Sequence, residues 1–161
     1  MDILSMEIAR QDWELMTCGC RRTGEHIPVD FLRSLDGPPP DRAGEGWADN
    51  HVFVQSNLMQ PAVATASFVM AALARGVPVE HRRQLMLVLH ALANGEQDDI
   101  AEECLGVIRG GSWLLYGEIS SGRDIDAASY AFEMLELIED ESSRFVKFRE
   151  AVRENLPSDL W

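Results

Sequence analysis

The chain has 161 residues, a length that allows one globular domain and hardly two. Its hydrophobic content of 46% and charged content of 25% are typical of soluble globular proteins and exclude disordered, collagen-like and membrane classes. The net charge of −13 argues against an unassisted nucleic-acid binder, because such proteins neutralise phosphates with clustered Lys and Arg. A partner with a basic surface is favoured instead, and the alternative that the charge only keeps the protein soluble stays open.

The N-terminus carries no recognisable targeting signal. Residues 1–7 contain two acidic side chains where a signal peptide needs a positive region, and no apolar run of 7 to 15 residues follows. No stretch of about 18 apolar residues could span a membrane. We therefore expect a cytoplasmic protein without membrane contact.

The three cysteines are Cys18, Cys20 and Cys104, an odd number in a chain long enough to fold without disulfides. The Cys18-Gly19-Cys20 sequence, followed by His26, could be a fragment of a metal site. Closed zinc sites, however, use four ligands at wider spacings. The sequence therefore predicts no metal and no other cofactor.

Residues 1–46 form the irregular part of the predicted fold. Leu4, Ile8 and Leu15 suggest a modest helix, and a short helix begins at Pro28 and buries Phe31, Leu32 and Leu35. The segment 37–46 contains three consecutive prolines and three glycines. It is predicted to be a long exposed loop.

In residues 47–156 the apolar residues have the regular spacing that is typical of a helical core. Trp47, His51, Val54 and Leu58 form one predicted helical stripe, on which His51 is interpreted as a core or groove residue. Breaks at Gly, Pro and Asp separate the helices that follow. These are predicted over 61–75, 79–93, 98–110, 113–121, 124–139 and 142–155.

The fold class predicted from these elements is all-α. Helices of about 12 to 15 residues with short connections favour a short α-solenoid of antiparallel helix pairs. An irregular helical bundle explains the same periodicity and stays open as the alternative.

Two stretches resemble small bacterial HEAT-like helical-repeat proteins. Residues 55–69 resemble a helix-proline-helix junction centred on Pro61, and 102–110 followed by 124–138 resemble a repeat unit. Ala131, Met134, Leu135 and Ile138 match the A-x-x-L-L-x-x-L helix of a HEAT unit. The sequence has Ala127-Ala128 where a Val-Arg pair is usual. The resemblance extends over 47–156.

The resemblance implies a non-catalytic protein-binding module. Proteins of this kind include immunity proteins of polymorphic toxin systems, which implies a cytoplasmic inhibitor of a basic toxin domain, such as a nuclease. A generic scaffold or adaptor in a larger assembly is the alternative. HEAT-like DNA glycosylases work from a basic concave face, which a net charge of −13 does not favour.

No catalytic motif supports an enzyme. The sequence has no G-x-S-x-G, H-E-x-x-H or Walker loop, and no G-x-G-x-x-G after a strand. Its four histidines are far apart in the sequence. We therefore expect a protein that is not an enzyme.

The acidic residues are the candidate partner-binding surface. Residues 94–161 hold 16 acidic and 6 basic side chains, so most of the net charge lies in this half. Acids in the first turn of a helix also suit the helix dipole without any partner, but acids near the C-terminal end of 124–139 do not. Exposed aromatic side chains would anchor the partner. The predicted partner-binding residues are Asp98, Asp99, Glu102, Trp113, Tyr116, Glu118, Glu133, Glu136, Glu139, Asp140 and Glu141.

Overall fold

The computed structural model describes residues 1–139 and 142–161 and is all-α, as the periodicity predicts. Eight α-helices and one two-stranded sheet are assigned within these residues. The helices are α1 (Ile3–Ala9), α2 (His26–Ser34), α3 (Ala62–Arg75), α4 (Val79–Ala93), α5 (Asp98–Gly110), α6 (Ser112–Ser121), α7 (Ile125–Glu139) and α8 (Ser143–Ala151).

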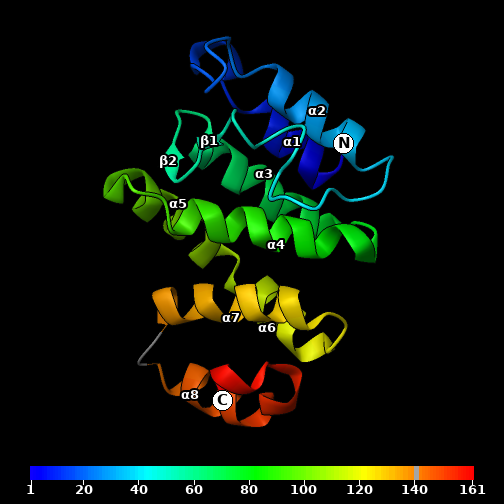
Figure 1. Ribbon diagram of the computed structural model, residues 1–161, viewed down its shortest axis with the longest axis vertical. Helices are drawn as coiled ribbons and strands as arrows, with labels where there is room; N and C mark the ends of the chain where they lie inside the picture. Colours follow the sequence, from blue (N-terminus) through cyan, green and yellow to red (C-terminus); the bar gives the residue numbers. More distant parts are fainter. Residues whose placement is uncertain (140–141) are drawn as a thin grey trace.

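The helices lie in successive layers along the long axis of the molecule (Figure 1). α1 and α2 form one end and α8 the other, so the chain progresses along this axis from its N-terminal to its C-terminal part. α3 packs on α1, α4 and α5, while α7 packs on α4 and α6. Whether these layers repeat as HEAT units stays a prediction.

Helix boundaries in the second half of the chain follow the helix breaks predicted from the sequence. α4 begins and ends as predicted, and α5 ends as predicted at Gly110. α3 ends at Gly76, which has a positive φ of 99°. α8 is shorter than predicted, because the chain continues as a 3₁₀ turn at Arg153–Asn155. Among the described residues, no helix is long and apolar enough to cross a membrane.

The helix predicted from the Trp47, His51, Val54 and Leu58 stripe is wrong. Turns occupy 43–52, and β1 (Phe53–Val54) pairs antiparallel with β2 (Asn57–Leu58). Asn50 and Gln55 have positive φ, which a continuous helix does not allow. Trp47 and Leu58 are buried as the stripe requires, so burial was predicted correctly and the backbone was not. The helical core therefore begins at Ala62 rather than at Trp47.

An aromatic cluster joins the irregular N-terminal part to α3. The Phe68 ring of α3 lies 4.9 Å from Phe31, 5.7 Å from Trp13 and 5.9 Å from Trp47. All four side chains are buried. Their stacking adds to the burial of apolar area and fixes residues 13–47 against the first long helix.

The Pro/Gly segment 37–46 is a mostly exposed loop, as predicted, but its backbone also contacts α4. His81 of α4 lies 2.9 Å from the carbonyl oxygen of Gly37, and the Gln84 side-chain amide donates to the carbonyl oxygen of Pro40 at 2.5 Å. The same Gln84 accepts from the backbone N–H of buried Gly44. These contacts hold the segment on α4, because the oxygen and the nitrogen of the buried Gln84 side-chain amide both bond to the backbone of the segment.

Candidate metal centre

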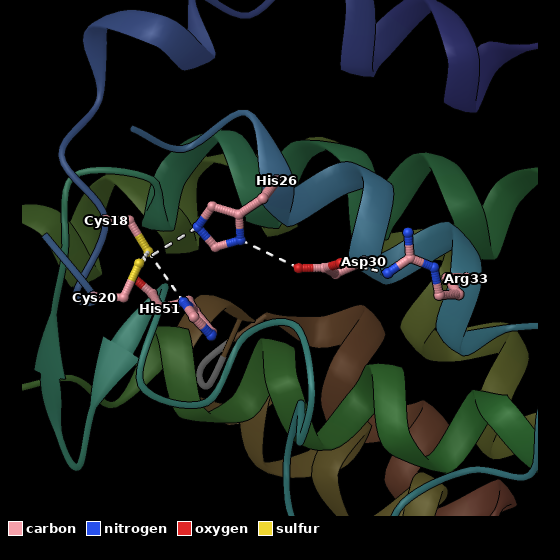
Figure 2. Close-up of polar contacts among 6 residues, drawn as sticks. All are labelled: Cys18, Cys20, His26, Asp30, Arg33 and His51. Carbon is pink, nitrogen blue, oxygen red and sulfur yellow. Dashed lines mark hydrogen bonds and ion pairs between the residues drawn. The ribbon is translucent and has the colours of Figure 1, made fainter. Parts of the chain in front are cut away.

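Four potential metal ligands from three separate segments converge beside β1 (Figure 2). They are Cys18 and Cys20 from the turn before α2, His26 at the start of α2, and His51 from the turn before β1. One ligand atom from each residue lies within 4.8 Å of all the others. Cys18, Cys20 and His26 are the fragment noted in the sequence, where no metal site was predicted. His51 was missed as a fourth ligand because it was placed on a helix.

Three of the distances within this cluster are close to those of a tetrahedral zinc site. Cys18 Sγ lies 3.2 Å from His51 Nδ1 and 3.3 Å from Cys20 Sγ, and Cys20 Sγ lies 3.6 Å from His26 Nε2. Zinc–sulfur bonds of about 2.3 Å and zinc–nitrogen bonds of about 2.0 Å place neighbouring ligand atoms about 3.3 to 3.8 Å apart. A metal ion could therefore be accommodated with small side-chain adjustments.

A tight turn brings the two cysteines together. The N–H of Cys18 donates to the carbonyl oxygen of Arg22, and the N–H of Arg21 donates to the carbonyl oxygen of Cys18. Arg21 takes a left-handed conformation with φ of 72° to close this turn. The turn directs both sulfur atoms toward the same point (Figure 2).

Gly19 allows the turn to lie against the His51 segment. Its N–H donates to the carbonyl oxygen of His51 at 2.8 Å. A Cβ atom at Gly19 would lie 2.8 Å from the carbonyl oxygen of Asn50 and 3.0 Å from Val54 Cγ2. Glycine is thus needed here for the close approach of two backbones.

The two thiols differ in environment. Burial raises the pKa of Cys18 to about 11. Burial also opposes ionisation of Cys20, yet hydrogen bonds from Arg22, Cys18 and His51 lower the pKa of Cys20 to about 5. Thiolates are the form that binds metal, and these hydrogen bonds favour that form of Cys20.

His26 is oriented by a carboxylate on its own helix. His26 Nδ1 lies 3.2 Å from Asp30 Oδ2, one turn further along α2, and Arg33 donates to Asp30 Oδ1 at 3.1 Å. This contact leaves Nε2 of His26 directed at the cysteines (Figure 2). Histidine ligands of metals commonly donate their second ring N–H to such a carboxylate.

The structure separates the predicted acidic surface into paired and unpaired residues. Glu133 pairs with His90 at 2.5 Å, and Glu139 accepts from Tyr116 and pairs with Arg144. Glu136 is half-buried on α7. Asp140 and Glu141 lie outside the described residues. The C-terminal end of α7 therefore presents less free negative charge than its sequence suggests.

Two predicted partner contacts are not on the surface. The Tyr116 side chain is only 4% exposed and packs edge-on against Phe148, so its predicted role as an exposed anchor is wrong. Glu118 is 1% exposed and pairs with Arg82 at 2.6 Å, because it faces α4 rather than solvent. Trp113, by contrast, is 68% exposed, with the Arg144 guanidinium over its ring.

The acids at the start of α5 do form an exposed group. Asp98, Asp99, Glu102 and also Glu103 are exposed, while Ala101 and Cys104 of the same helix face the core. Within the described ranges none of the four forms an ion pair. We call Asp98, Asp99, Glu102 and Glu103 the α5 acidic face.

No family model, curated protein or solved structure matches the chain.

The close approach at Gly19 makes a specific prediction. Gly19→Ala should lower the free energy of unfolding by about 1–3 kcal/mol, because the added methyl overlaps backbone and must displace the turn. Urea denaturation followed by circular dichroism measures this change.

Gly37→Ala is the matched control, because a Cβ there meets nothing within 4 Å. Its unfolding midpoint should stay within error of the unmodified protein. Equal effects of the two substitutions would contradict the assigned packing of the turn.

Proposed function

We propose that this protein is a zinc-binding, non-catalytic helical protein that binds a partner. The observation that carries the zinc proposal is the convergence of two thiols and two imidazoles within 4.8 Å. Two cysteines and two histidines are a common ligand set of structural zinc sites, which leave no coordination position open for substrate. The metal would therefore act as a cross-link.

The cross-link would join parts of the chain with little regular structure. Cys18 and His51 are 33 residues apart, and the segments that carry them contain turns and a two-residue strand rather than long helices. Zinc that binds only the folded state adds stability in proportion to the logarithm of its concentration over its Kd. At a thousandfold excess over Kd the gain is about 4 kcal/mol.

The zinc proposal predicts about one zinc per chain. Protein purified under reducing conditions and dialysed against trace zinc should hold this amount by elemental mass spectrometry. Cys18→Ser and His51→Ala should lose most of it and unfold at lower temperature, because each removes one of four ligands.

Cys104→Ala serves as the control, because Cys104 is a buried residue of α5 outside the cluster. It should keep its zinc. A metal-free wild-type protein, with no thermal shift on zinc addition, would contradict the proposal.

Asp30 supplies a second prediction about the centre. Asp30→Asn should weaken zinc binding about 10- to 100-fold, because the carboxylate orients His26 and increases its basicity. Competition with a chromophoric chelator measures the affinity, and thermal unfolding of the metal-free form shows whether the fold itself has changed.

Asp36→Asn is the comparison variant, because Asp36 is exposed just beyond the C-terminal end of α2. Its zinc affinity should equal that of the wild type. The same loss in both variants, or in neither, would rule out a specific role for Asp30.

The partner that we propose is a protein with a basic surface. The α5 acidic face supports this, since four exposed acids lie on one helix while three predicted acids elsewhere are already paired. Opposite charges across an interface raise the rate of encounter and fix its orientation. A cytoplasmic immunity protein that occludes a basic toxin domain would use such a face, and exposed Trp113 offers an apolar contact.

A scaffold or adaptor role is the second candidate function, since fold alone does not distinguish it. The product of a neighbouring gene with a toxin domain is the partner to test first. Co-purification and inhibition of that toxin support the immunity role, whereas co-purification with a larger assembly and no toxin inhibition supports the scaffold.

Charge reversal tests the α5 acidic face. The triple variant Asp98→Lys, Asp99→Lys, Glu102→Lys should slow association with the basic partner and flatten its salt dependence, because steering is electrostatic. Stopped-flow or surface-based kinetics at low and high salt measure both effects.

The triple variant Glu150→Lys, Glu154→Lys, Asp159→Lys makes the same change in net charge at exposed C-terminal positions. It should slow association less. Equal slowing by both variants would mean that net charge, and not this face, governs the encounter.

A further inference from the structure

We propose that the Cys18–Cys20 pair is also a redox-sensitive release for the bound metal, in which a peroxide converts the two thiolates to a disulfide and frees the zinc. This inference rests on the proposed zinc site and adds its regulation. It assigns to the centre a sensing role besides cross-linking.

The geometry favours a disulfide between these two residues. Their sulfur atoms are 3.3 Å apart, and only Gly19 separates them in the sequence. A disulfide bond of about 2.05 Å requires the sulfurs to move closer by little more than 1 Å.

Accessibility distinguishes the two roles within the pair. Cys20 is half-buried, while Cys18 is 1% exposed. A small oxidant in solvent therefore reaches Cys20 first, and Cys18 lies behind it as the resolving thiol. Cys104 is fully buried on α5 and takes no part.

The chemistry proceeds in two balanced steps. The sulfur of Cys20 attacks one oxygen of hydrogen peroxide, the O–O bond breaks, and a sulfenic acid and hydroxide form. The sulfur of Cys18 then attacks the sulfur of Cys20, an S–S bond forms, and a second hydroxide leaves. Two protons convert the hydroxides to two waters. The thiolates have lost two electrons, and the peroxide has gained them.

Loss of both thiolates removes the anionic half of the ligand set. Only the two imidazoles remain, so zinc dissociates because a disulfide is a poor ligand for it. The backbone contact from Gly19 to His51 and the hydrogen bond from the N–H of Thr17 to Gln60 do not depend on the metal. The oxidised protein should therefore loosen locally while the helices persist.

The test begins with reduced, zinc-loaded full-length protein. Hydrogen peroxide is added while a chromophoric chelator reports free zinc and mass spectrometry reports the protein. We expect about one equivalent of zinc to be released together with a mass loss of two hydrogens, and a peptide containing the Cys18–Cys20 bond. A dithiol reductant with added zinc should reverse both changes.

Hydrogen exchange measures the structural consequence. Amide exchange should rise at 18–22 and 50–53 after oxidation and stay unchanged in α4 and α7. Cys104→Ala should release zinc like the wild type.

Two results would overturn the redox release while leaving the zinc site standing. One is zinc that stays bound after peroxide treatment sufficient to oxidise free thiols. The other is zinc release in which Cys20 is found as a sulfinic or sulfonic acid and no disulfide forms. A reduced protein that never binds zinc would overturn the site itself, and the release with it.

Discussion

The first sixty residues of this protein hold little regular secondary structure, so their position depends on a few long-range contacts. In the proposed account, a zinc ion bound by Cys18, Cys20, His26 and His51 is the contact on which the arrangement of this part depends. Two sulfurs and two ring nitrogens from three segments are brought within 4.8 Å of one another. Hydrogen bonds link these atoms in the structure. In the proposed account a zinc ion bound by all four would take the place of these bonds.

The aromatic cluster and the proposed metal centre stabilise the same region in different ways. Trp13, Phe31, Trp47 and Phe68 bury apolar area between the irregular part and α3, a contribution that depends on area and only weakly on orientation. The metal centre would instead fix direction, because its ligands are tetrahedral. Asp30 and Gly19 then acquire clear roles, one orienting a ligand and the other permitting the close approach of two backbones.

The helical half of the fold was readily predicted from the sequence. α4 and α5 follow the apolar periodicity, and Gly or Pro marks their ends. The apolar stripe from Trp47 to Leu58 led to a wrong helix prediction, because turns can bury the same apolar residues that a helix would. Asp49 and Asn50 were the available signal, since such residues favour turns and Asn tolerates positive φ. The sequence alone does not show that 33 residues of chain return His51 to Cys18.

Partner-binding residues were harder to assign, because a charge pattern does not show which side chains already have partners. Glu118 and Glu133 contact Arg82 and His90 of α4, from which they are separated by 36 and 43 residues in the sequence. Among the predicted partner-binding acids that the structure describes, Asp98, Asp99 and Glu102 combine exposure with the absence of an ion pair. X-ray absorption at the zinc edge of the reduced protein tests the central claim most directly. The account predicts two sulfur neighbours at about 2.3 Å and two nitrogen neighbours at about 2.0 Å. A shell of nitrogen and oxygen alone, or no zinc signal, would contradict it.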